Sequence, residues 1–177
     1  TALGMDDIRP SEFTGPYISP KEFKQMLDYG EEVVVLDTRN DYETRVGMFD
    51  GAVDLDIATF RDFPRAIEEL PDEYRSKTVV MYCTGGIRCE KASAVMLKAG
   101  FDDVRQLEGG ILGYFEECGG THWNGDCFVF DQRVALDNQL EETEIVMCFK
   151  CREPLSAEEQ TSEQYVIGQH CPYCYGA

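Results

Sequence analysis

Residues 78–99 most constrain the fold, because a run of β-forming residues there gives way to small residues and then to helix formers. The β-forming run is Thr78–Tyr82, and Cys83 follows it at once. This pattern predicts a strand, a tight loop and a helix in direct succession. The N–H groups of such a loop and the positive end of the helix dipole lower the pKa of a neighbouring thiol. Cys83 is therefore predicted to react as a thiolate.

The predicted loop begins with a cysteine and ends with an arginine, with four residues between them. Its members are Cys83, Thr84, Gly85, Gly86, Ile87 and Arg88. Protein phosphatases place one more residue in this interval and form a wider ring around a phosphate group. A tighter ring suits a sulfur atom carried on the cysteine. Arg88 is either a catalytic residue or one that stabilises the loop, and Cys89 is either a resolving thiol for Cys83 or an inert packing residue.

Short apolar runs alternate with helical patterns through about residue 120. The apolar runs cover 33–36, 78–82 and 104–107. Such alternation is typical of a parallel sheet flanked by helices, so the predicted fold class is α/β. In open sheets of this kind the site lies at the carboxyl ends of the strands. We therefore expect Asp37 and Cys83 at the same edge of the sheet.

Start and stop signals locate the predicted helices. Ser19 is a predicted N-cap with Pro20 in the first turn, and this helix ends at Gly30. A short helical stretch then places Arg39 and Glu43 four residues apart, which is the spacing of an ion pair on one helix face. The other predicted helices are 60–74 with an interruption near Pro64, the stretch that ends at Gly100, and 111–118.

The net charge of −18 is the main feature of the composition. It argues against non-specific binding to nucleic acid or to an anionic membrane. The acid-rich stretch 137–163 is expected to be a solvated face or a mobile loop. No apolar run is long enough for a transmembrane helix, and no signal peptide is visible. With eight cysteines, four of them in C-x-x-C pairs, a reducing cytoplasmic location is expected.

The two C-x-x-C pairs near the C-terminus predict a metal site. They are Cys148 with Cys151 and Cys171 with Cys174, separated by 19 residues. Thiolates at this spacing form the two knuckles of a tetrahedral zinc site, and four cysteines leave no open position for catalysis. We therefore expect a structural zinc ion. The alternative is a set of reduced or redox-active thiols.

Residues 121–145 are expected to be a β-hairpin and connector, with 126–131 and 132–136 as its arms. His122 is either an acid–base residue or a packing or surface residue, and the second reading is preferred. Trp123 is either a stacking platform for a base or part of the core, and the core is preferred. His170 adjoins the second cysteine pair and is expected to be a spectator.

Three segments resemble rhodanese domains: the loop 83–88, the stretch VVVLDTRNDYETRVGMFDGA at 33–52, and LEGGILGYFEECGG at 107–120. The resemblance covers about residues 17–120. It implies a rhodanese-like fold with Cys83 at the position that carries a persulfide. It also implies that Asp37 and Arg39 are structural and brace the edge of the active site.

A narrower resemblance is to the bacterial tRNA uridine 5-hydroxylase family. It rests on CTGGIRCEKAS at 83–93, WNGDCFVFDQRVAL at 123–136 and the paired C-x-x-C motifs. It implies oxygen-dependent 5-hydroxylation of the wobble uridine of tRNA, with molecular oxygen as co-substrate, tRNA as partner and Cys83 as the catalytic position. The expected organisation is a linker at 1–16 from an N-terminal domain, a rhodanese-like domain at 17–120, the hairpin connector at 121–145 and a zinc-ribbon-like tail at 146–177.

Two other functions are consistent with the same residues. One is a sulfurtransferase that carries a persulfide on Cys83, held by the loop amides and Arg88. The other is a catalytically silent rhodanese-like module whose tail binds a partner. A tRNA-binding protein normally presents a basic face, and the basic residues of the rhodanese-like segment are the candidates for one. They are Arg61, Arg65, Arg75, Lys77, Arg88, Lys91 and Lys98.

Overall fold

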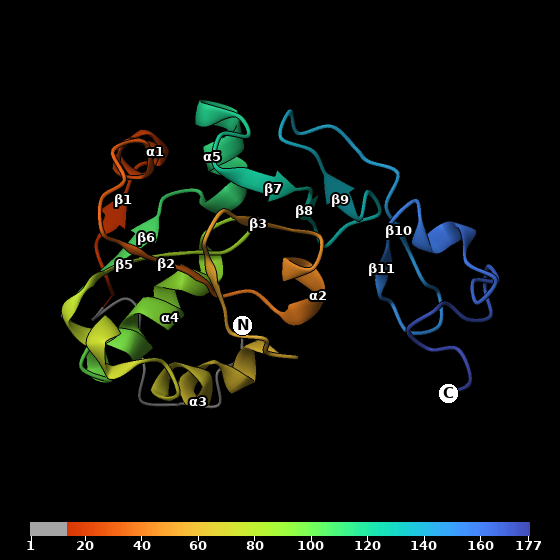
Figure 1. The fold of residues 1–177 in the computed structure, drawn as a ribbon, viewed down its shortest axis with the longest axis horizontal. Helices are drawn as coiled ribbons and strands as arrows, with labels where there is room; N and C mark the ends of the chain where they lie inside the picture. The colour runs from red at the N-terminus through yellow and green to blue at the C-terminus, as the bar shows by residue number, and fades with distance from the viewer. Residues whose placement is uncertain (1–13) are drawn as a thin grey trace.

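The computed structural model describes residues 14–177, so residues 1–13 of the predicted linker lie outside the described residues. The centre of the molecule is a five-stranded sheet in the order β1-β6-β5-β2-β4 (Figure 1). All of its strand pairs are parallel. The strands are β1 (Tyr17–Ile18), β2 (Val34–Asp37), β4 (Val53–Asp54), β5 (Thr78–Tyr82) and β6 (Asp103–Leu107). The predicted α/β class is confirmed.

Helices cover both faces of this sheet. Helices α1 (Pro20–Asp28) and α5 (Gly110–Cys118) lie on one side, and α3 (Phe63–Glu68) and α4 (Ile87–Lys98) lie on the other (Figure 1). Strand β5 contributes side chains to the core on both sides of the sheet, because successive side chains of a strand point to opposite faces. Val79 and Met81 pack towards α3 and α4, whereas Val80 and Tyr82 pack towards α1 and α5. The sheet is therefore buried on both sides.

The first helix begins as its sequence predicts. Ser19 has extended backbone angles, and its side chain accepts a hydrogen bond from the Glu22 N–H at 3.2 Å. Pro20 occupies the first helical position, where a missing N–H is harmless. Phe23 is fully buried and points to the core. The predicted N-cap is confirmed.

The predicted helix over 60–74 is wrong in its extent. The segment forms three short pieces, η1 (Phe60–Asp62), α3 and η2 (Asp72–Ser76). Pro64 stands in the first turn of α3 rather than interrupting a longer helix. Pro71 precedes η2 with an extended ψ of 134°, so the chain has already left the helix there.

A small antiparallel layer follows the parallel sheet. Strand β7 (Trp123–Gly125) pairs with β3 (Gly47–Phe49), which sequence reasoning did not predict. Strand β8 (Cys127–Phe128) pairs with β9 (Ala135–Leu136), so a hairpin with these arms is confirmed. Trp123 is 8 % exposed and packs edge-on against Phe49 and Phe115. The preferred core position of Trp123 is confirmed, and the ring is not free to stack on a base.

The C-terminal tail lies beside α2 (Asp41–Thr44) and the hairpin (Figure 1). It contains the antiparallel pair β10 (Val146–Met147) and β11 (Pro154–Leu155) and the short helix η3 (Glu159–Thr161). Its small buried core consists of Leu155 and three of the four tail cysteines. Within residues 14–177, no helix has the length and apolar character needed to cross a membrane.

Candidate active site and metal centre

Cys83 lies directly after β5, at the carboxyl edge of the sheet, and is only 1 % exposed. Its Sγ accepts a hydrogen bond from the Gly86 N–H at 3.1 Å. Gly86 has a φ of +94°, a conformation that a residue with a side chain rarely adopts, and α4 begins at the next residue. The predicted strand, loop and helix are confirmed, and the loop turns an amide towards the thiol.

The start of α5 supports this loop from behind. The Ile111 N–H donates to the Cys83 carbonyl at 3.0 Å, and the Leu112 N–H donates to the Thr84 carbonyl at 3.1 Å. A Cβ on Gly110 would lie 2.5 Å from the Cys83 carbonyl oxygen, so only glycine allows this close approach. Sequence reasoning missed this support, although the pair Gly109-Gly110 before a helix was its visible sign.

The surroundings of Cys83 lower the pKa of its thiol to about 6. The main cause is a hydrogen bond from the Cys89 side chain, and the positive charge of Arg88 and the amides of both residues add to it. Burial raises the pKa of Cys83, but by less than these causes lower it. Cys89 is fully buried, and its own thiol pKa is raised well above the usual range by that burial. Cys83 is thus poised as the thiolate, with Cys89 as its protonated donor.

Arg88 does not point freely into the site. Its Nη1 and Nη2 atoms donate to the two carboxylate oxygens of Glu43 at 2.7 and 2.8 Å, and Glu43 is completely buried. Nη2 also lies 3.3 Å from the Thr84 hydroxyl. The expected pairing of Glu43 with Arg39 is wrong, because Glu43 reaches across to the Cys83 loop instead. Glu43 is a site residue that sequence reasoning missed.

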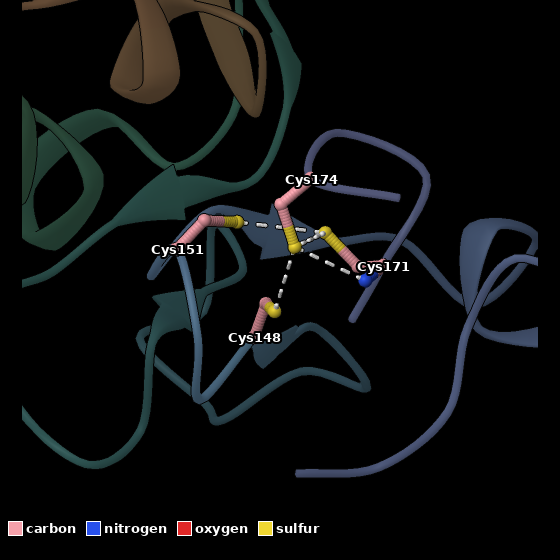
Figure 2. Close-up of side chains that lie close together, drawn as sticks. All are labelled: Cys148, Cys151, Cys171 and Cys174. Carbon is pink, nitrogen blue, oxygen red and sulfur yellow. Dashed lines mark hydrogen bonds between the residues drawn. The ribbon is translucent and has the colours of Figure 1, made fainter. Parts of the chain in front are cut away.

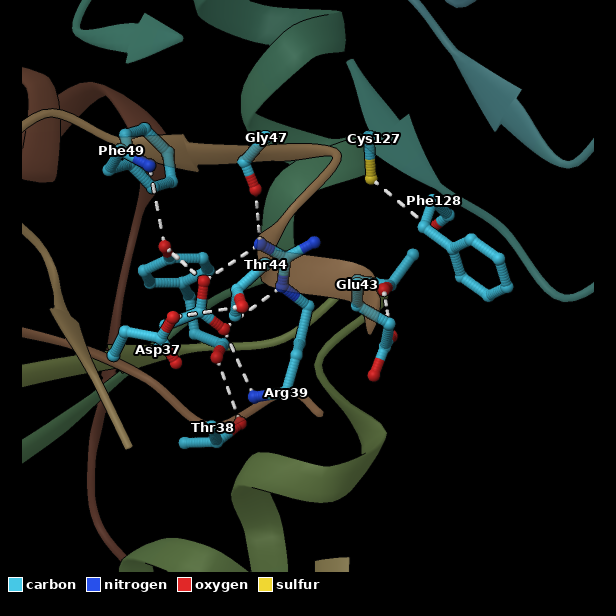
Figure 3. Close-up of polar contacts among 12 residues, drawn as sticks. Asp37, Thr38, Arg39, Glu43, Thr44, Gly47, Phe49, Cys127 and Phe128 are labelled. Carbon is cyan, nitrogen blue, oxygen red and sulfur yellow. Dashed lines mark hydrogen bonds and ion pairs between the residues drawn. The ribbon is translucent and has the colours of Figure 1, made fainter. Parts of the chain in front are cut away.

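Arg39 belongs to a separate buried network, shown in Figure 3. Its Nε and Nη2 atoms donate to the two oxygens of Asp37 at 2.9 and 2.7 Å, and Nη2 also donates to the Gly47 carbonyl at 2.6 Å. The Tyr82 hydroxyl completes the cluster by donating to Asp37 at 2.5 Å. The network ties the ends of β2 and β5 to β3, and none of its side chains lines the cavity beside Cys83.

A cavity of about 390 Å³ opens beside Cys83. Its floor is the loop, and its walls are mainly apolar or aromatic side chains. The lining residues are Asn40, Tyr42, Phe60, Cys83, Thr84, Gly85, Ile87, Arg88 and Phe130. Phe130 comes from the β8–β9 hairpin and is 64 % exposed. Asn40, Tyr42 and Phe130 lie in stretches that sequence reasoning quoted, but it did not single them out as lining residues, because the fold brings these stretches together.

The four tail cysteines converge as predicted (Figure 2). Their Sγ atoms all lie within 4.8 Å of one another, and the Cys148–Cys174 and Cys151–Cys171 pairs are separated by 4.0 and 3.5 Å. Four sulfurs bound tetrahedrally to zinc at about 2.3 Å would stand about 3.8 Å apart. The cluster therefore fits a metal ion of this kind. His170 is not part of it, since its Nδ1 lies 2.9 Å from the Gln164 carbonyl.

Other candidates from the sequence lie away from Cys83. The His122 ring contacts Asp28 of α1 at 2.7 Å and does not line the Cys83 cavity. Three of the candidate residues for a basic face are paired: Arg75 with Asp72, Lys77 with Glu32, and Arg88 with Glu43. These three residues are engaged with carboxylates and do not form an open basic surface.

A parallel sheet with a cysteine after a central strand, followed by a C-x4-R loop that opens a helix, defines the rhodanese-like class. The family description "Rhodanese-like domain" matches residues 19–117, so the chain belongs to the rhodanese-like domain family. Solved structures agree on the fold. The rhodanese-like domain of an Anabaena protein superposes with a TM-score of 0.52 at 24% identity, over 62% of this chain and 79% of that one. A Bacillus halodurans protein superposes with a TM-score of 0.51 at 23% identity, over 63% of this chain and 77% of that one.

Curated relatives extend the similarity beyond the rhodanese-like segment. A protein of Cupriavidus necator named tRNA uridine(34) hydroxylase is 51% identical over 99% of this chain. A Burkholderia cenocepacia protein of the same name is 50% identical over 94% of it. The alignments cover 64% and 61% of the two relatives, so this chain spans less than two thirds of their length.

Proposed function

We propose that the protein is a tRNA-modifying enzyme that hydroxylates the wobble uridine at C5, with molecular oxygen as co-substrate. The observation that carries this proposal is the low-pKa Cys83 at the floor of a cavity that opens to the surface. It is supported by relatives named tRNA uridine(34) hydroxylase at 51% identity over 99% of the chain, hairpin and tail included. A location in the cytoplasm, where tRNA is modified, agrees with eight cysteines that form no disulfide.

Each residue of the loop has a distinct role in this proposal. Cys83 presents a thiolate to the target base, and the Gly86 N–H stabilises its negative charge at 3.1 Å. Thr84, Gly85 and Ile87 shape the floor and rim of the cavity. Arg88 supplies positive charge near the sulfur while Glu43 fixes its position. Arg88 is thus a positioning residue in this scheme.

We further propose that the tail cysteines hold a structural zinc ion. Cys148, Cys151, Cys171 and Cys174 would supply all four ligands, which leaves no position for a substrate. The tail buries little else, since Pro154 and Leu155 are its buried residues that are not cysteines. Metal binding would therefore provide most of the free energy that folds residues 146–177.

A plain sulfurtransferase is less well supported. In that scheme the guanidinium of Arg88 would hold the outer sulfur of a Cys83 persulfide. Both terminal nitrogens of Arg88 are already committed to Glu43. The relatives that match the full length of this chain are also named as hydroxylases.

The proposed function is tested by nucleoside analysis of tRNA from a bacterial strain that lacks its own enzyme of this type. The strain is complemented with the wild type, with Cys83→Ser or with Cys118→Ser, a matched control thiol on α5 outside the site. We expect 5-hydroxyuridine with the wild type and the control and none with Cys83→Ser. Equal 5-hydroxyuridine with and without Cys83 would rule out the proposal. The two chemistries would be separated by a wild-type protein that hydroxylates tRNA but transfers no sulfur from thiosulfate.

A further inference from the structure

A second cavity of about 420 Å³ adjoins the Cys83 cavity. No residue of the Cys83 loop lines it, and Cys151 is the one residue of the cysteine cluster that does. It lies between the hairpin and the tail. Its lining residues are Tyr42, Phe128, Phe130, Asp131, Met147, Cys151, Arg152 and Glu153. Both cavities fall in the size range of small-ligand sites, which is about 300–1,000 Å³. Neither the rhodanese-like fold nor the proposed chemistry at Cys83 requires this second cavity.

The two cavities share one wall. Tyr42 and Phe130 line both of them, and their rings meet edge-on at a centroid separation of 6.4 Å. Phe128 packs edge-on against Phe130 at 5.0 Å from the other side. The Arg88 guanidinium lies 5.6 Å from the Phe130 ring centre on the side of Cys83. Phe130 is therefore held in a fixed orientation although 64 % of it is exposed to solvent.

The second cavity also offers an uncommitted positive charge. Both acids that line it are already paired, Asp131 with Arg133 at 2.6 Å and Glu153 with Arg45 at 2.9 Å. Arg152 is exposed and makes no ion pair within the part of the chain that the structure describes. In a chain with a net charge of −18, an arginine left without a carboxylate beside a cavity is a site for an external anion.

An exposed aromatic ring between two cavities, with an arginine beyond it, matches the requirements of single-stranded RNA. Successive bases stack on aromatic rings, and the phosphates between them bind arginine. We propose that the second cavity binds the nucleotide adjacent to the target uridine, with its phosphate on Arg152 and with Phe130 between the two bases. This inference rests on the proposed function for the base in the Cys83 cavity and adds a neighbouring nucleotide subsite.

The proposal is tested by binding of fluorescein-labelled hexauridylate to the zinc-loaded protein, measured by fluorescence anisotropy. We expect Phe130→Ala to weaken binding about tenfold, because base–aromatic stacking is lost. Phe130→Trp should retain binding, whereas Phe130→Leu, which keeps an apolar side chain without a ring face, should behave like Phe130→Ala. The control is Tyr29→Ala, which removes a 70 % exposed ring at the end of α1 that lines neither cavity.

Arg152→Gln should weaken hexauridylate binding about fivefold and reduce the slope of log affinity against log salt by about 1. Lys21→Gln removes the same charge from the exposed face of α1 and is the matched control. Uridine has neither a phosphate nor a neighbouring nucleotide, so its binding should be the same in Arg152→Gln and in the wild type. Thermal unfolding should be unchanged in all these variants, because the altered side chains are exposed.

The outcomes separate this inference from the proposed function. Equal affinities for Arg152→Gln and Lys21→Gln, or for Phe130→Ala and Tyr29→Ala, would overturn the subsite whether or not tRNA is hydroxylated. Weaker binding by Arg152→Gln and Phe130→Ala, combined with Cys83-independent 5-hydroxyuridine, would support the subsite and reject the proposed function. Both stand if binding falls as expected and hydroxylation requires Cys83.

Discussion

Arg88 and Glu43, which lie 45 residues apart in the chain, form a two-pronged ion pair directly beside the Cys83 loop. The contacts measure 2.7 and 2.8 Å, and Glu43 has no exposed surface. The pair joins α2 to the start of α4. It fixes the charge of Arg88 at one place near the Cys83 sulfur, which a surface arginine with several rotamers could not provide.

Glu43→Gln should reduce the free energy of unfolding by about 3 kcal/mol. Removing one partner of a buried ion pair leaves the other charge without compensation in the interior. Urea unfolding followed by circular dichroism measures this change. Glu141→Gln, an exposed residue, serves as the control for loss of one negative charge. Equal unfolding midpoints for the two variants would show that the pair does not support the loop.

The rate of Cys83 alkylation by iodoacetamide should rise with pH and reach half its plateau near pH 6. The thiolate is the reactive form, and the pKa of Cys83 is lowered to about 6, so reactivity is lost as the pH falls below that value. Cys89→Ala should move the midpoint upward, because it removes the largest cause of the lowered pKa. Mass spectrometry identifies the alkylated residue, and an unshifted midpoint in Cys89→Ala would contradict this account.

Gly110→Ala should disturb the Cys83 loop, and Gly30→Ala should not. Both glycines have positive φ angles, +61° and +63°, so alanine costs about 1 kcal/mol of backbone strain at either site. A Cβ at Gly110 would also lie 2.5 Å from the Cys83 carbonyl oxygen, whereas one at Gly30 would meet nothing within 4 Å. We expect Gly110→Ala to lose more stability and to raise the alkylation midpoint of Cys83. Identical behaviour of the two variants would argue against support of the loop by α5.

Removal of metal should unfold the tail and leave the rhodanese-like domain folded. The purified protein should contain about one zinc per chain by elemental analysis, and Cys171→Ser should contain much less. Limited proteolysis of the chelated protein should then cut within 146–177, because the apolar core there is small. Protection of that segment after complete metal removal would show that it folds without metal.

The sequence predicted those features of the fold that depend on residues close together in the chain. The strand Thr78–Tyr82, the place of Cys83 at its end, the Ser19 cap and the convergence of the tail cysteines all depend on residues close in sequence or on a repeated spacing. For Glu43, the sequence showed only a neighbour four residues away, Arg39. Its actual partner, Arg88, became a neighbour only when β2 and β5 paired in the sheet.

The cavity walls were less accessible to sequence reasoning for the same reason. Phe130 lies in a hairpin whose position depends on the pairing of β7 with β3. That pairing joins strands about 75 residues apart and carries no signal beyond short β-forming runs. The exposure of Phe130 also runs against the general tendency of phenylalanine to be buried, which is why an aromatic pattern alone would have placed it in the core.

The hairpin that carries Phe130 lies outside the segment 19–117 that matches the rhodanese-like family, yet it forms part of the wall of the Cys83 cavity. One aromatic wall residue of the cavity is therefore encoded after the stretch that encodes Cys83 and the rest of the lining. Exchange of this hairpin would therefore change one wall of the cavity and leave the Cys83 loop in place. The pairing of β7 with β3 is what places Phe130 there, so the hairpin and the rhodanese-like segment build this wall together.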